Sequence, residues 1–132
     1  MTRSELREHT FKVVFGKAFD IGAEREEQIS RYFKCEEEIN ESDKEFIENR
    51  CRLIDEKLDE IDDLLNERTT GWKTSRMNKV DLAILRLACF ELKYDEEIPT
   101  GVAINEAVEL AKKYSSDEGP AFVNGVLAKL VD

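Results

Sequence analysis

Long apolar runs are missing from this sequence of 132 residues. No stretch approaches the roughly 18 consecutive apolar residues that a membrane-spanning helix requires, and no apolar segment follows the charged N-terminus to form a secretion signal. Cysteines are few and widely spaced, so Cys35, Cys51 and Cys89 form neither a disulfide framework nor a CxxC motif. The simplest interpretation is a cytoplasmic protein with reduced thiols.

Groups that commonly carry catalysis are also scarce. The single histidine, His9, falls between Glu8 and Thr10 on an expected helix, and we interpret it as a surface residue without a matched partner. One histidine and three dispersed cysteines make no recognisable metal site, and no glycine-rich phosphate-binding motif is present. Acidic pairs such as Asp62-Asp63 are expected to be solvated charge. We therefore expect no enzyme, metal or cofactor, although a site built from carboxylates alone stays open.

Helix breakers are rare as well, with six glycines and two prolines. Charged residues make up 38% of the chain and hydrophobic residues 41%, a composition that favours helices over a many-turned β structure. The net charge of −10 argues against nucleic acid as a bulk electrostatic partner. The acidity is concentrated in residues 35–68, which hold 5 basic and 14 acidic side chains, whereas residues 1–19 hold four basic and two acidic ones.

Apolar spacing predicts an all-α fold. In the first half, helices are expected over residues 3–21, 24–34 and 43–68, with Ser42 as the N-cap of the third helix and Glu45 completing a capping box. An a/d heptad seam along the third helix is made by Ile47, Cys51, Ile54, Leu58, Ile61 and Leu65.

The second half is more apolar. Residues 79–94 are apolar on nearly all sides, which is typical of a buried central helix. Further helices are predicted over residues 102–114 and about 120–131, with Pro120 in the first turn of the last one.

Polar residues interrupt the last two predicted helices at Asn105 and at Asn124-Gly125. Asn and Gly inside a helix each cost roughly 0.5–1 kcal/mol relative to Ala. Gly125 therefore suggests close approach of another backbone. The asparagines are expected to cap or bridge neighbouring helices, with exposure to a partner as the alternative.

Three ordered segments carry a resemblance. AINEAVELAKKY at 103–114, followed closely by FVNGVL at 122–127, resembles the signature of the NusB family. VDLAILRLACFEL at 80–92 is similar to that family's central helix, and Trp72 and Arg76 ahead of it also fit. The first half of the chain agrees only in its helical pattern and in an Arg-Glu pair near its start.

The resemblance implies an all-helical fold of two small bundles. We expect a single domain over 1–132, with N-terminal helices at about 3–68 and C-terminal helices at about 76–131 packed around the central helix. The resemblance also implies a bacterial transcription antitermination factor. Such a protein pairs with NusE, a ribosomal protein, binds boxA RNA of nascent ribosomal RNA transcripts and joins the RNA polymerase antitermination complex.

The same resemblance implies two sets of site residues. The RNA surface would combine Arg3, Arg7 and Lys12 of the first helix with Tyr114, Glu118 and Phe122. NusE would lie against Phe15 and Asp81. The residues themselves leave alternatives open: Phe122 is equally consistent with a core position, and Asp81 with an internal pair to Lys79 or Arg76.

One departure from the family pattern affects RNA binding. NusB proteins often begin with a dense arginine run, which is reduced here to Arg3 and Arg7. Each lost phosphate contact removes about one unit from the salt dependence of binding. We therefore expect weak binding of RNA alone and useful affinity only together with NusE.

Two other functions remain open at this stage. NusB-like domains also occur fused to RNA cytosine methyltransferases, so the chain could be a stand-alone RNA-docking domain. It could also be a structural module that dimerises through the seam at 47–65, although such a seam more often packs inside its own monomer. The sequence does not distinguish a monomer from a homodimer.

Overall fold

The computed structural model describes residues 1–19, 24–36, 38–69 and 73–131, and this part of the chain contains helices and no strands. In chain order the elements are α1 (Arg3–Gly16), the 3-10 turn η1 (Lys17–Phe19), α2 (Arg25–Cys35), α3 (Glu41–Glu56), α4 (Leu58–Arg68), the 3-10 turn η2 (Thr74–Arg76), α5 (Lys79–Tyr94), α6 (Thr100–Tyr114) and α7 (Gly119–Leu130). The predicted all-α fold is confirmed.

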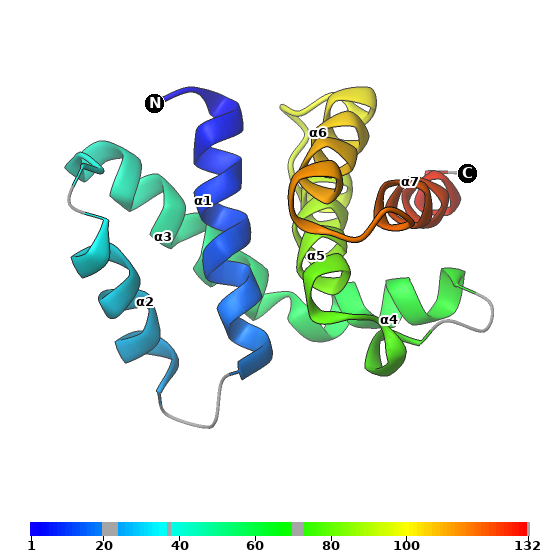
Figure 1. Ribbon diagram of the computed structural model, residues 1–132, viewed down its shortest axis with the longest axis horizontal. Helices are drawn as coiled ribbons and strands as arrows, with labels where there is room; N and C mark the ends of the chain where they lie inside the picture. Colours follow the sequence, from blue (N-terminus) through cyan, green and yellow to red (C-terminus); the bar gives the residue numbers. More distant parts are fainter. Residues whose placement is uncertain (20–23, 37, 70–72, 132) are drawn as a thin grey trace.

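The helices form two groups on either side of the molecule (Figure 1). α1, α2 and α3 lie together on the left of that view, and α4, α6 and α7 lie on the right beside α5. α5 packs against α1 from one group and against α4, α6 and α7 from the other. Among the helices described, none is long and apolar enough to span a membrane.

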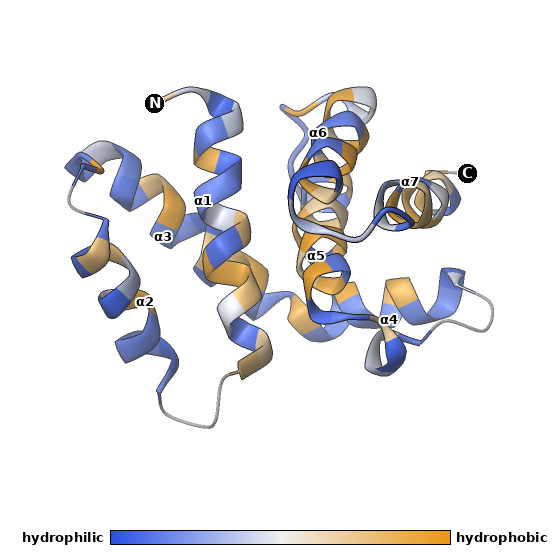
Figure 2. Ribbon diagram, viewed as in Figure 1, coloured by the Kyte–Doolittle hydropathy of each residue, from blue (hydrophilic) through white to orange (hydrophobic). Residues whose placement is uncertain are grey.

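The central position of α5 follows from its sequence. Every residue from 81 to 91 is buried except Arg86, which is half-buried, and the ribbon of α5 is mostly hydrophobic (Figure 2). Arg86 donates two hydrogen bonds to Asp62 of α4, of 3.0 and 2.8 Å. The buried central helix predicted from residues 79–94 is therefore confirmed, whereas the interpretation of Asp62 as solvated charge is wrong.

The heptad seam packs inside the chain. Five of its six residues have no exposed surface: Ile47, Cys51, Ile54, Ile61 and Leu65. The seam is therefore occupied by this chain's own core and is not available for dimerisation.

The single helix predicted over 43–68 is wrong in one respect, because it is broken at Lys57. Lys57 has φ −97° and ψ 7°, and its N–H is shared between the carbonyls of Leu53 and Ile54 at 3.1 Å each. The bend lets the seam change partners, since α3 packs on α1 whereas α4 packs on α5 and α7.

Several helix ends differ from the prediction by a few residues. The N-cap of α3 is Asn40 and not Ser42, because the Asn40 side chain reaches the first-turn amide at 2.8 Å. α6 begins at Thr100, since Pro99 has the extended backbone of an N-cap and costs no helical hydrogen bond there. Pro120 lies in the first turn of α7, as expected.

The first helix is shorter than predicted. α1 ends at Gly16, and the chain continues as the 3-10 turn η1 to Phe19. The predicted stop at Gly22 and the predicted loop position of Trp72 lie outside the described residues.

Three further expectations are corrected by the surroundings of the residues concerned. His9 has a partner, because its Nδ1 and the Tyr32 hydroxyl share a hydrogen bond of 2.6 Å. Gly125 is exposed, and a Cβ built there would meet nothing within 4 Å, so no neighbouring backbone approaches it. Asn105 and Asn124 are exposed too.

Candidate nucleic-acid and partner interface

α1 and α6 are joined by a row of charged contacts. Arg7 Nη1 lies 3.2 Å from a carboxylate oxygen of Glu106. Further along α1, Glu8 accepts hydrogen bonds from Lys113 at 2.8 Å and from the Tyr114 hydroxyl at 2.7 Å. Burial alone would raise the pKa of Glu8, but the hydrogen bonds from Lys113 and Tyr114 hold that pKa below its ordinary value. The contacts fix the position of the C-terminal end of α6 against α1.

Aromatic rings continue this row toward the end of α1. The Tyr114 ring centroid lies 5.1 Å from that of Phe11, Phe11 lies 6.3 Å from Phe15, and Phe15 lies 5.2 Å from Phe19. Phe11 is buried at 3% exposure, Phe15 is half-buried, and Phe19 is 53% exposed. Lys79 Nζ lies 5.8 Å from the centroid of the Phe19 ring. The row therefore emerges from the core onto the surface at η1 and the start of α5.

Asp81 holds the turn between α6 and α7. Its carboxylate accepts hydrogen bonds from the Ser115 hydroxyl at 2.6 Å and from the Asn78 side-chain amide at 2.9 Å. A Cβ on Gly119 would lie 2.0 Å from the Ser115 hydroxyl oxygen and 3.3 Å from the Asp81 carboxylate. Glycine is therefore required at position 119 for the turn to close onto α5. Asp81 is only 5% exposed, and its internal partners differ from those considered from the sequence.

Arg7 does not lie where an RNA-binding residue would. Its Nε and Nη2 donate to both carboxylate oxygens of Glu91 over 2.7 to 3.1 Å, and the residue is 9% exposed. Burial raises the pKa of Glu91, and the Arg7 guanidinium opposes that rise. An RNA contact by Arg7 stays a prediction, and in this structure its guanidinium is directed at carboxylates inside the protein.

The other predicted RNA residues are spread over three helices. Arg3 is exposed at the start of α1, about 18 Å along the helix axis from Phe15. Lys12 is half-buried on α1, and Glu118 is exposed at the N-terminal end of α7. Phe122 is half-buried against the hydrophobic core.

The structure thus gathers Tyr114, Phe15 and Asp81 around one end of α1 and leaves Arg3 at the other. Sequence reasoning assigned Tyr114 to RNA and the other two to NusE, yet the ring contacts and the Ser115 hydrogen bond place all three in one continuous region.

Lys113 was missed from the sequence, although it stands directly before Tyr114 in the motif. Its side chain is 60% exposed, and its Nζ lies 5.4 Å from the centroid of the Tyr114 ring. Lys112 beside it is 59% exposed. The Lys112-Lys113-Tyr114 run was a usable signal, because adjacent cations and an aromatic ring at a helix end form an anion-facing surface.

Comparison with known proteins identifies the chain's relatives. The family model described as "NusB family" matches residues 4–132. The chain belongs to the NusB family. It is 52% identical over 132 residues to the "Transcription antitermination protein NusB" of Lachnoclostridium phytofermentans, with 100% of both chains covered. It is 53% identical over 131 residues to the protein of the same name from Agathobacter rectalis, with 98% of both chains covered.

Solved structures of the NusB family share this fold. NusB from T. maritima is 33% identical, with a TM-score of 0.89 over 98% of this chain and 90% of that chain. A NusB crystallised with NusE and dsRNA is 23% identical, with a TM-score of 0.84 over 98% of this chain and 97% of that chain. The match to the NusB family covers both halves of the chain. The sequence alone links the first half to that family only weakly.

Proposed function

We propose that this chain is a transcription antitermination factor that acts together with NusE. The pair binds boxA RNA of nascent ribosomal RNA transcripts and joins the RNA polymerase antitermination complex. The name carried by relatives of the same length at 52% and 53% identity supports this function over a docking domain of an RNA cytosine methyltransferase. A protein of the same fold has been crystallised with NusE and dsRNA.

The observation that carries the RNA part of the proposal is the end of α6. Lys112 and Lys113 are the exposed cations beside Tyr114, on a protein whose net charge is −10. Single-stranded RNA is commonly held by aromatic rings that stack on bases and by neighbouring cations that contact phosphates. Arg3 adds a cation at the far end of α1, where a bound strand would continue.

The partner part of the proposal uses the aromatic row. Phe19 is 53% exposed and contacts half-buried Phe15 edge to face, so the two rings offer apolar surface to NusE at the end of α1. Asp81 is buried, and it therefore contributes by fixing the turn that begins at Ser115 rather than by pairing with a NusE cation.

The RNA surface is tested by Lys113→Gln, measured as anisotropy of labelled boxA RNA titrated with the protein and NusE at several salt concentrations. One lost phosphate contact lowers the magnitude of the log–log salt slope by about 0.7 for a single strand. Lys34→Gln on α2 is the matched control, because Lys34 is exposed and distant in sequence from the α6 motif. An unchanged affinity and slope for Lys113→Gln would remove Lys113 from the site.

A further inference from the structure

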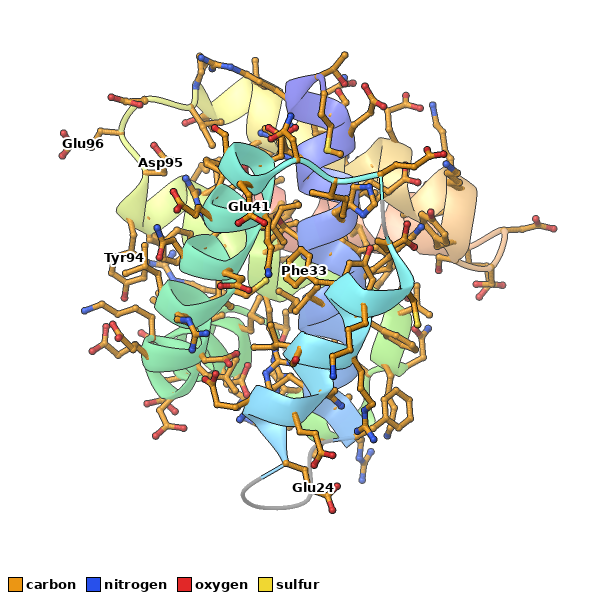
Figure 3. The ribbon with its side chains drawn as sticks, turned by 90° about the vertical axis from the view of Figure 1, so that its left-hand side faces the viewer. Glu24, Phe33, Glu41, Tyr94, Asp95 and Glu96 are labelled. Carbon is orange, nitrogen blue, oxygen red and sulfur yellow. The ribbon has the colours of Figure 1, made fainter. Side chains whose placement is uncertain are left out.

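A second exposed apolar region lies apart from the basic end of α6 and from the aromatic row, on α3 and at the end of α5. Three of its side chains are large and exposed: Phe46 at 43%, Leu53 at 45% and Tyr94 at 36%. We name these three residues the α3 stripe. Phe46 and Leu53 are seven positions apart and therefore project from the same side of α3. Tyr94 lies beside α3 at the edge of the molecule, next to Asp95 and Glu96 (Figure 3).

Arg50 and Phe90 connect two members of the α3 stripe, Phe46 and Tyr94. Its guanidinium carbon lies 5.2 Å from the centroid of the Phe46 ring and 5.1 Å from that of Phe90. Phe90 in turn lies 5.5 Å from the Tyr94 ring, and Arg50 pairs with Asp95 at 2.7 Å. The rings of Phe46 and Tyr94 are therefore already held in place by the protein, so a partner that binds these two rings loses little conformational entropy.

A hollow of about 170 Å³ opens beside Phe46. Its apolar wall includes Leu6, Leu87 and Ile98, so α1, α5 and the link to α6 all contribute. A volume of this size equals that of several waters, at about 30 Å³ each, and would hold one aliphatic side chain. The hollow gives the α3 stripe a pocket, which is where interface hot spots concentrate.

Carboxylates surround the stripe and the hollow. Residues 41–60 and 94–98, which cover α3, the start of α4 and the end of α5, hold 11 acidic side chains, among them Glu45, Glu56, Glu60, Asp95, Glu96 and Glu97. The cations closest to the stripe include Arg50, which pairs with Asp95, and Lys57, whose Nζ lies 5.2 Å from the Tyr94 ring centroid. Arg3 lines the hollow from the α1 side. The same two segments hold four basic side chains, so this region is acidic. The hollow itself is lined by three arginines and three carboxylates.

The negative charge of this region indicates which kind of partner can bind there. RNA would be repelled by the acidic face. A second copy of this chain would set the same acidic face against its own, and like charges juxtaposed across an interface cost several kcal/mol. A basic segment with one apolar face matches both the exposed apolar side chains of the stripe and the acidic side chains around it.

We propose that the α3 stripe docks a basic amphipathic helix of a protein partner. An aliphatic side chain of that helix enters the hollow beside Phe46, its apolar face covers Leu53 and Tyr94, and its lysines or arginines face Glu96 and Glu97. This surface adds a protein contact beyond the RNA and NusE contacts of the proposed function. It shares one residue with the proposed RNA surface, because Arg3 lines the hollow.

The probe is a synthetic helical peptide as long as α3, with leucines on one face and lysines and arginines on the other. Binding to the full-length, ¹⁵N-labelled protein is followed by NMR. The amide signals of residues 46–53 and 94–98 are expected to shift, whereas those of 112–122 stay in place. A scrambled peptide of the same composition but with no apolar face should bind at least about tenfold more weakly.

Two pairs of variants separate the apolar and charged parts. One double variant combines Phe46→Ser with Leu53→Ser, and the other combines Glu96→Lys with Glu97→Lys. Each double variant should weaken peptide binding at least about tenfold, or about 1.4 kcal/mol. All four residues are exposed, so the fold is expected to survive. Val102→Ser matches the apolar change, because Val102 is 46% exposed on α6. Glu27→Lys on α2 matches the charge change, and both controls should bind normally.

Three results would overturn the proposal. Equal binding of the scrambled peptide would show attraction to bulk charge only. Shifts centred elsewhere, or unaffected by the four substitutions, would place the peptide at another surface. Concentration-dependent self-association in sedimentation, abolished by Leu53→Ser, would assign the stripe to a second copy of the chain instead.

Discussion

Arg7 of α1 and Glu91 of α5 form a two-pronged ion pair in the interior, with distances from 2.7 to 3.1 Å. The pair joins the helix group that contains α1 to the central helix. Glu106 of α6 approaches the same guanidinium at 3.2 Å, so one arginine connects three helices. A residue that the family resemblance assigned to RNA is therefore part of the structural framework that positions α6 and its basic end.

Arg7→Ala is expected to lower the free energy of unfolding by about 3–5 kcal/mol, because it leaves a buried carboxylate unpaired. Since burial raises the pKa of Glu91, the deficit should shrink as the pH falls and Glu91 takes up a proton. Urea unfolding at several pH values measures both effects.

Arg52→Ala is the matched control for that substitution, because Arg52 pairs with Glu26 on the surface, at 43% and 70% exposure. Such a pair contributes at most about 1 kcal/mol. Equal losses from the two substitutions would contradict the structural role assigned to Arg7.

Gly119 and Gly125 are expected to respond to alanine in opposite directions. A Cβ at position 119 would overlap Ser115 at 2.0 Å, so Gly119→Ala should destabilise the protein and weaken NusE binding by displacing the turn. A Cβ at position 125 meets nothing within 4 Å on an exposed helical position, so Gly125→Ala should stabilise by about 0.5–1 kcal/mol. Thermal unfolding of the two variants measures the difference, and a stabilising Gly119→Ala would refute the proposed geometry.

The cysteines should react with thiol reagents at very different rates. Cys51 and Cys89 are fully buried, and burial raises their pKa values to about 12 and about 11. Cys35 is exposed. In the folded protein at neutral pH only the Cys35 thiol should react rapidly, and Cys35→Ser should remove that reaction. Labelling of Cys51 as fast as Cys35 without denaturant would be inconsistent with this core.

Glu8 should make a small contribution to stability that depends on pH. Lys113 and Tyr114 lower the pKa of Glu8 in the folded state from its ordinary value of 4.5. Its contribution to stability is therefore present above pH 4.5 and is lost as the pH falls through the pKa of the folded state. Glu8→Gln should therefore be less stable than the parent protein at neutral pH and equally stable in acid. A difference that persists in strong acid would mean that this charge is not responsible.

Periodicity predicted the helices well because burial dominates their placement. The seam residues and the residues of α5 lie in the core as their spacing indicated. The break at Lys57 left no trace in the sequence, since no glycine or proline marks it and its cause is a change of packing partner. Likewise Asn40 and Ser42 are both competent N-caps, and only the packed chain selects between them.

The candidate site was harder to predict than the fold. Resemblance assigns a role to a position, but whether a side chain reaches the surface depends on residues distant in sequence. Arg7 is turned inward by Glu91, and Asp81 is held by Ser115, two contacts that span 84 and 34 positions. Conversely, the exposure of Lys113 beside Tyr114 depends on how α6 packs against α1.

This protein is expected to depend on NusE for RNA binding, because its N-terminal arginines are reduced to Arg3 and Arg7 and the Arg7 guanidinium is held by Glu91 and Glu106. Anisotropy titration of labelled boxA RNA with this protein alone, with NusE alone and with both tests it most directly. Weak binding by each protein and much tighter binding by the mixture is the predicted result. Tight, sequence-selective binding by this protein alone, unchanged by NusE, would contradict the account.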